Sequence, residues 1–178
     1  MNSGVIFVAG CYGVGKSTLC DKLSQRLSIP FYSAGDLISE INGESYGANK
    51  AVKDKDQNQQ YLIDSVEYKM QVVPVLLLAG HFCIFNKLDQ VERLPENVFN
   101  SLKIKHILLL EADTNQIIKN LYKRDSKCYS SENITLLQAA EQHQALKIAA
   151  SLSVPITIHQ MKFNDSDVDE LLMVLRKE

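Results

Sequence analysis

The chain lacks tryptophan and has little of any residue that marks an unusual class of protein. Its 178 residues include eight glycines and four prolines, which are ordinary counts and exclude a fibrous repeat. Hydrophobic residues make up 46% and charged residues 22%, close to the average of a globular domain, so the composition also excludes a disordered chain. At this length we expect one domain, covering residues 1–178.

The sequence also has no excess of one charge and no long hydrophobic run. Nineteen Lys and Arg residues stand against 21 Asp and Glu residues, a formal net charge of −2. No overall positive field would hold nucleic acid, so we do not expect nucleic acid as a partner. The apolar runs are shorter than the roughly 18 to 20 residues that cross a bilayer, and the first residues lack a basic leader. We therefore expect a soluble protein with neither an export signal nor a membrane partner.

The few cysteines form no recognisable pattern. Cys11, Cys20, Cys83 and Cys128 fit neither the spacing of zinc ligands nor a Cys-x-x-Cys redox pair. We interpret them as free thiols of a reducing compartment, which predicts a cytoplasmic protein.

Short apolar runs and helical repeats alternate along the chain. Strands are predicted at residues 5–9, 30–33, 73–79, 105–110 and 154–158. Helices are predicted at residues 16–27, 36–41, 51–72, 134–152 and 165–176, with a further helix that Asp113 or Thr114 caps. The alternation predicts an α/β fold in which helices cover a parallel sheet and ligands bind at the carboxyl ends of the strands. Two polar stretches, residues 42–60 and 124–132, are predicted to be insertions over one face.

A glycine-rich motif lies between the first predicted strand and the first predicted helix. Residues 10–17, Gly-Cys-Tyr-Gly-Val-Gly-Lys-Ser, match G-x-x-x-x-G-K-[ST] in full. In this motif backbone N–H groups and the helix N-terminus hold phosphate oxygens, Lys16 reaches the β and γ phosphates, and the Ser17 hydroxyl binds Mg²⁺. The residues predicted to bind nucleotide are Gly10, Tyr12, Gly13, Val14, Gly15, Lys16, Ser17 and Thr18.

Four further segments, residues 33–38, 76–82, 121–125 and 141–152, follow the loop in an order typical of one superfamily. With them the chain resembles the adenylate-kinase-like P-loop kinases, and its order of segments is most similar to the archaeal type of adenylate kinase. The resemblance implies a three-layer P-loop fold with a five-stranded parallel sheet of order 2-3-1-4-5. It also implies an acceptor-binding insertion at residues 34–72, a short lid at residues 124–132, and the cofactors ATP and Mg²⁺.

The segment Ser-Ala-Gly-Asp-Leu-Ile at residues 33–38 resembles the start of the acceptor-binding helix, which implies a role for Asp36 at the acceptor. The superfamily usually places an arginine shortly after this Asp to hold the acceptor's phosphate, whereas this chain has Ser39 and Glu40. The lysines at positions 50, 53 and 55 are alternative cations, and a solvated helix face is the simpler interpretation of them.

The segment Leu-Leu-Leu-Ala-Gly-His-Phe at residues 76–82 ends the third predicted strand. Relatives commonly carry an Asp here that holds a magnesium-bound water, and this chain has Ala79 and Gly80 instead. We expect His81 at the acceptor site, where it would hydrogen-bond the substrate or act as a base; a structural role is the alternative. The carboxylates that could replace the missing Asp are Asp36, Glu111 and Asp113.

The segment at residues 121–125 resembles the entry to the lid, where arginines fold over the triphosphate. This implies that Arg124 stabilises the transferred phosphoryl group, although a basic residue at a helix end is also what the helix dipole favours. We interpret residues 141–152 as a helix that contributes packing and surface, with His143 either exposed or behind the residues that contact the ligand.

The predicted function is an ATP-dependent transfer of a phosphoryl group to a small acceptor, a nucleotide or nucleoside. Two alternatives stay open: a nucleotide-dependent switch or regulatory ATPase that acts on a protein partner, and a 5′-hydroxyl nucleic-acid kinase. The predicted catalytic residues are Lys16, Arg124, His81 and Asp36.

Overall fold

A computed structural model describes residues 3–42, 55–126 and 128–176 of the chain. Five parallel strands form the central sheet in the order β2-β3-β1-β6-β7. Counted within this sheet alone, the order is 2-3-1-4-5, as predicted. The bounds of its strands are β1 Gly4–Gly10, β2 Phe31–Ser33, β3 Val75–Ala79, β6 Ile104–Glu111 and β7 Ile156–Gln160.

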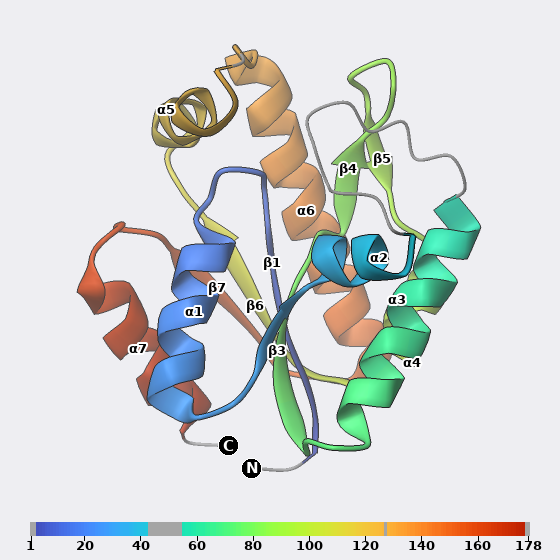
Figure 1. Ribbon diagram of the computed structural model, residues 1–178. Coiled ribbons are helices and arrows are strands. Elements are labelled where there is room, and N and C mark those ends of the chain that lie inside the picture. The colour runs from blue at the N-terminus through green and yellow to red at the C-terminus, as the bar shows by residue number, and fades with distance from the viewer. Residues whose placement is uncertain (1–2, 43–54, 127, 177–178) are drawn as a thin grey trace.

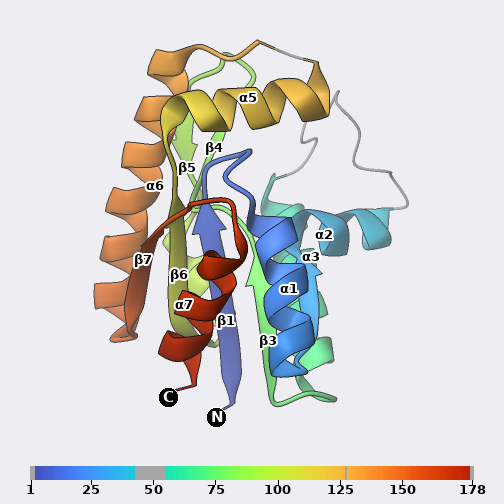
Figure 2. The ribbon, with the colours of Figure 1, turned by 90° about the vertical axis from the view of Figure 1, so that its left-hand side faces the viewer.

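The three-layer arrangement follows from the burial of the sheet on both faces. All residues of β1 and β3 are buried, which explains why these strands are continuous apolar runs without polar alternation. Helices α1 (Lys16–Leu27) and α7 (Asp165–Leu175) cover one face, and α6 (Ser131–Leu152) covers the other (Figures 1 and 2). The α/β fold class is thus confirmed.

Two helices lie at the carboxyl ends of the strands, where the candidate site is formed. Helix α5 (Thr114–Asp125) crosses the carboxyl ends of the strands, as Figure 2 shows. The Asp113 side chain accepts a hydrogen bond of 3.0 Å from the Gln116 N–H, so Asp113 caps this helix as one of the two predicted candidates. Helix α2 (Ala34–Asn42) follows β2 at the same edge of the sheet.

The predicted insertions are partly described. Within residues 34–72, α2 is followed by α3 (Lys55–Met70), while residues 43–54 and the side chains of Lys50, Lys53 and Lys55 lie outside the described part. The segment 124–132 contains the end of α5 and the first residues of α6, with residue 127 outside the described part.

Three short elements between β3 and β6 were missed by the sequence analysis. Strands β4 (Cys83–Phe85) and β5 (Val91–Arg93) form an antiparallel hairpin, and helix α4 (Glu96–Ser101) follows it. The Asn86 side chain closes the hairpin turn by accepting hydrogen bonds from the N–H groups of Leu88 and Gln90. Strands of three residues are too short to show an alternating pattern, so only the tertiary fold reveals them.

All four cysteines are free, as predicted: Cys11, Cys20 and Cys83 are buried and Cys128 is exposed. In the described part of the chain, no helix combines the length and the apolar character that crossing a bilayer requires.

Candidate active site

The glycine-rich motif forms a loop between β1 and α1, at the carboxyl edge of the sheet. Gly13 has φ 76°, a left-handed conformation that favours glycine, and a Cβ there would lie only 2.7 Å from Leu121 Cγ. Asn120 Nδ2 donates a hydrogen bond of 2.9 Å to the Gly13 carbonyl. Helix α5 therefore packs directly on the loop and fixes its conformation.

Gly15 is the N-cap of α1 and supplies no side-chain cap to the first turn of that helix. An N-terminus without a capping side chain presents N–H groups and the positive end of the helix dipole, which suits a phosphate. Ser17 and Thr18 are exposed in this first turn, whereas the Val14 side chain is buried, so Val14 offers a ligand only its backbone.

Lys16 points back into the loop. Its Nζ donates hydrogen bonds to the carbonyl oxygens of Gly10 at 2.7 Å and Cys11 at 3.0 Å. Burial lowers the pKa of Lys16 to about 8 from its ordinary 10.5, and the carboxylate of Glu141 opposes that shift. The Lys16 ammonium therefore donates its hydrogen bonds to these two carbonyls. A β or γ phosphate oxygen would replace the carbonyls as acceptor.

The residues around the loop fit a magnesium ion held mainly by phosphates. Ser17 offers its exposed hydroxyl, but β3 ends in Ala79, so the adjacent strand contributes no carboxylate. Burial raises the pKa of Glu111 at the end of β6, and Asp113 is engaged in capping α5. The described residues contain no cluster of three or more metal-ligating side chains. The Ser17 hydroxyl alone is compatible with Mg²⁺, because that ion usually keeps waters and substrate phosphates as ligands.

His81 follows β3 and lies beside the phosphate loop. Its ring centroid is 4.4 Å from that of Tyr12, and the Tyr12 ring in turn stacks on Phe85 of the hairpin at 6.0 Å. His81 Nδ1 is 3.2 Å from Glu141 Oε1. The structure thus brings the predicted residues Tyr12 and His81 into direct contact at the carboxyl edge of the sheet.

Three neighbours act on the protonation of His81. Burial lowers its pKa below the ordinary 6.5 and the nearby charge of Lys16 lowers it further. The hydrogen bond and the charge of Glu141, together with the carbonyl of Gly10, act in the opposite direction. The ring is therefore neutral around pH 7.

Glu141 is the residue that the sequence interpretation missed. Its carboxylate is 1% exposed and accepts hydrogen bonds from the N–H groups of Phe82, at 3.1 Å, and Cys83, at 3.3 Å. A signal was present, because Glu141 lies four residues after Leu137 and four before Ala145, both fully buried, on the apolar stripe of α6. His143 on the same helix is exposed, as expected.

The remaining two predicted catalytic residues lie apart from this contact. Asp36 is exposed in the first turn of α2, where its N–H donates to Ser33 Oγ at 3.4 Å. Arg124 lies in the last turn of α5 and makes two hydrogen bonds of 2.6 Å to the carboxylate of its neighbour Asp125. The charge of Arg124 contributes to lowering the pKa of Lys16, which places Arg124 within electrostatic reach of the loop. Their roles stay predictions.

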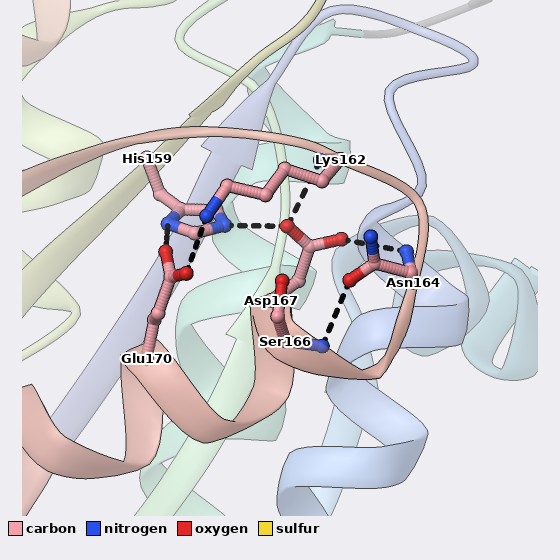
Figure 3. A network of polar contacts seen from close by, with 6 residues as sticks. All are labelled: His159, Lys162, Asn164, Ser166, Asp167 and Glu170. Carbon is pink, nitrogen blue, oxygen red and sulfur yellow. Dashed lines mark hydrogen bonds and ion pairs between the residues drawn. The ribbon is translucent and has the colours of Figure 1, made fainter.

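The segment after β7 forms one wall of the phosphate loop and was not predicted as part of the site. A Cβ on Gly15 would lie 3.3 Å from Met161 Cε and 3.5 Å from Phe163 Cε1. Buried Asp167 holds this segment, because its carboxylate accepts hydrogen bonds from the N–H groups of Lys162 and Asn164 (Figure 3). The same segment could not be found from its sequence, because its contacts with the loop are made only in the folded chain.

A network of ionisable side chains anchors Asp167 in turn. His159 on β7 lies 2.8 Å from Asp167 Oδ1 through Nε2 and 3.9 Å from Glu170 Oε2 through Nδ1, as Figure 3 shows. Glu170 also pairs with the Lys162 ammonium. The network joins β7, the following segment and α7 into one support for the loop.

Comparison with known proteins decides the family. A model described as AAA domain matches residues 9–138, which include the phosphate loop, His81 and Arg124. The chain belongs to the AAA domain family. The matched residues of this AAA domain include the phosphate-binding loop, so the family and the motif both indicate nucleotide binding. No curated protein sequence matches the chain.

Solved structures resemble this AAA domain over nearly its whole length. The shikimate kinase from Acinetobacter baumannii, in complex with shikimate, has a TM-score of 0.65 at 13% identity and covers 99% of this chain and 95% of its own. The shikimate kinase from Aquifex aeolicus has a TM-score of 0.61 at 18% identity, covering 97% and 96%. A gluconokinase from Sinorhizobium meliloti has a TM-score of 0.59 at 13% identity, covering 98% and 93%. At these identities the likeness concerns the P-loop kinase fold.

Proposed function

We propose that this AAA domain is an ATP-dependent phosphotransferase that moves the γ-phosphoryl group of ATP to a small acceptor, a nucleotide or nucleoside. One observation carries the proposal: the titratable ring of His81, which follows the strand next to β1, lies against the phosphate loop that holds Lys16. A donor site and a proton-accepting group thus share one edge of the sheet. Two structural neighbours, a shikimate kinase and a gluconokinase, support a small acceptor.

The mechanism assigns each group to one part of the transfer. The loop amides and Lys16 hold the β and γ phosphates, once Lys16 leaves the carbonyls of Gly10 and Cys11. Arg124 gives up its hydrogen bonds to Asp125 and stabilises the negative charge that develops on the transferred phosphoryl group. The Ser17 hydroxyl would hold Mg²⁺, which would neutralise part of the phosphate charge. Asp36 and His81 flank the acceptor, whose oxygen attacks the γ phosphorus in line.

The adenylate-kinase-like subtype is part of the proposal and rests on the order of segments. Two features argue instead for a nucleotide-dependent switch with a protein partner. Ala79 ends β3 where relatives carry a carboxylate, and the sequence has no Lys or Arg between Arg26 and Lys50 to hold an acceptor phosphate. A 5′-hydroxyl nucleic-acid kinase would need a basic channel, which the net charge of −2 does not suggest.

The experiment is a transfer assay with γ-labelled ATP and Mg²⁺ over nucleoside monophosphates, nucleosides, shikimate, gluconate and short 5′-hydroxyl oligonucleotides. We expect label on a small acceptor, loss of transfer in Lys16→Ala, and unchanged transfer in Lys22→Ala. Lys22 is a matched control because it lies on the same helix and only pairs with exposed Asp165. ATP hydrolysis without a labelled acceptor would refute the kinase and favour the switch.

A further inference from the structure

Glu141 is a buried carboxylate that serves three hydrogen-bond donors of one turn. It lies in the middle of α6 and reaches the end of β3, sixty residues away in sequence, where it meets His81 Nδ1, Phe82 N and Cys83 N. Burying a carboxylate is costly unless hydrogen bonds or a counter-charge compensate. An apolar side chain at this place on α6 would leave the N–H groups of Phe82 and Cys83 and the His81 Nδ1 without this acceptor. The carboxylate therefore serves the turn and also faces one ring nitrogen of His81.

We propose that Glu141 is a positioning residue that holds the proton of His81 on Nδ1, leaving the second ring nitrogen as proton acceptor for a hydroxyl-bearing substrate. The inference rests on the proposed function and narrows its acceptor to a hydroxyl, as in a nucleoside or polyol, rather than a phosphate. The carboxylate of Glu141 accepts hydrogen bonds only, and so does the Gly10 carbonyl, the other acceptor at the ring. Because a charged acceptor binds a proton donor more strongly than a neutral one, Glu141 favours the proton on the nitrogen that lies 3.2 Å from it.

The groups that face His81 suit a base that takes up one proton and returns it. Lys16 on α1 and burial keep the resting ring neutral, because both lower its pKa. After proton uptake, the imidazolium is stabilised by Glu141 on α6 and by the Gly10 carbonyl at the end of β1. The Tyr12 ring at 4.4 Å holds the imidazole from the side of the loop.

The chemistry of the acceptor explains why a base is present. A hydroxyl must lose its proton as its oxygen bonds to phosphorus, whereas a phosphate monoester is an anion at neutral pH and needs no base. In the transfer, the acceptor oxygen bonds to the γ phosphorus and the bond from phosphorus to the bridging oxygen breaks. The electron pair of that bond leaves with ADP. The hydroxyl proton passes to His81, which later gives it to water.

The lack of cations in the sequence between Arg26 and Lys50 agrees with this acceptor. Residues 27–49, which include β2 and the acceptor-side helix α2, contain neither Lys nor Arg. An acceptor phosphate of about two negative charges would lack a partner on that segment, whereas a neutral hydroxyl compound needs none.

Glu141→Gln tests the inference by removing the charge at constant shape. With a hydroxyl acceptor we expect kcat to fall roughly 10-fold or more, with the KM for ATP changed less than about twofold. The acid limb of the pH profile should move to lower pH, because the lost carboxylate no longer raises the pKa of His81. A carboxylate that only supports the turn would lower thermal stability and leave the acid limb in place.

Two variants complete the kinetic test. Glu132→Gln is the matched control, since Glu132 is exposed in the first turn of the same helix, and should keep both kcat and the pH profile. His81→Gln should remove the acid limb altogether. An unchanged kcat and acid limb in Glu141→Gln would overturn the inference while leaving the kinase intact.

Nitrogen NMR of the ¹⁵N-labelled wild-type protein provides a readout that needs no variant of Glu141 and no acceptor. The chain has four histidines, and His81→Gln identifies the signals of His81. We expect neutral His81 with its proton on Nδ1, and a proton on the other nitrogen would overturn the inference. If the proton is on Nδ1 but no acceptor is labelled, the proposed function fails and the positioning by Glu141 stands. If only phosphate acceptors are labelled, the hydroxyl acceptor is wrong.

Discussion

Lys16 has to change its hydrogen-bond partners when a nucleotide binds. Without one, its ammonium donates to the carbonyls of Gly10 and Cys11, and burial lowers its pKa to about 8. Phosphate oxygens would favour the charged form strongly, because they place several negative charges within hydrogen-bond distance. Nucleotide binding and protonation of Lys16 are therefore linked.

This linkage predicts proton uptake on ATP binding. At pH 8.5 much of Lys16 is neutral in the free protein and charged in the complex, so each binding event should draw protons from the buffer. Calorimetric titrations in two buffers of different ionisation enthalpy measure the uptake, which should grow from pH 7 to pH 9. Lys22→Ala should show the same uptake as wild type. Identical binding heats in both buffers at pH 8.5 would contradict the linkage.

Gly13 gives a second prediction for a single residue. Alanine there would combine φ 76° with a Cβ 2.7 Å from Leu121 Cγ, so we expect a loss of stability of about 1–3 kcal/mol and weaker nucleotide binding. Gly35→Ala is the control, because Gly35 is helical in α2 and alanine suits a helix better than glycine. Urea denaturation measures both. Equal stability of Gly13→Ala and wild type would show that α5 does not fix the loop.

Among the elements, the link between β7 and α7 shows how the phosphate loop is supported from outside. Met161 and Phe163 lie against Gly15, and Asp167 holds the segment that carries them. Burial raises the pKa of Asp167, but hydrogen bonds from the Lys162 N–H, His159 and the Asn164 N–H outweigh burial, so the pKa lies below the ordinary 3.8. The charged form of Asp167 therefore stabilises the folded state.

The sign of that shift sets a pH window for a third prediction. A carboxyl with a lowered pKa contributes its stability above the unfolded value near 3.8 and loses it as pH falls through the lower folded value. Asp167→Asn should lose about 2 kcal/mol at pH 7, with a smaller difference from wild type at pH 3. Asp169→Asn is the control on the same helix, since Asp169 is exposed in a surface pair with Arg26. Equal losses in both variants, measured by urea denaturation, would refute the role of Asp167.

Over the whole molecule, the core carries three thiols that the fold keeps protonated. Burial raises the pKa of Cys11, Cys20 and Cys83 to about 12 from the ordinary 9.0. Their contribution to stability is complete below pH 9 and is lost as pH rises toward 12, at up to about 1.4 kcal/mol per pH unit for each thiol. Lys16 has the opposite effect on stability between pH 8 and 10.5, because its pKa is lowered in the folded state. Its contribution therefore offsets the loss of stability from one thiol.

The balance predicts alkaline destabilisation of the protein. Urea midpoints should fall between pH 8.5 and pH 10.5, and Cys20→Ala should show a shallower fall because one buried thiol is gone. Cys128→Ala should keep the wild-type slope, since Cys128 is exposed. A midpoint that stays constant up to pH 10.5 would contradict the prediction.

The elements that could be predicted are those encoded by neighbouring residues. The strands of the sheet are unbroken apolar runs, and the phosphate loop is a contiguous motif whose glycines fit its left-handed dihedral angles. The hairpin β4–β5 escaped prediction because three residues per strand carry no period, and its turn depends on one side chain, Asn86. The role of Arg124 at the transferred phosphoryl group stays a prediction, and its pairing with Asp125 needed the structure.

The sequence by itself determined the α/β class and the nucleotide loop, because local spacing specifies them, whereas the strand order came from the resemblance to a family. Only the tertiary structure decided that Glu141 meets His81, since α6 must pack beside β3 before residues sixty positions apart can form a hydrogen bond. It likewise decided that Met161 and Phe163 wall the loop. The residues next to a carboxylate on a helix do not show whether it faces water or the end of a strand. Its environment is decided by how the helix packs in the folded chain.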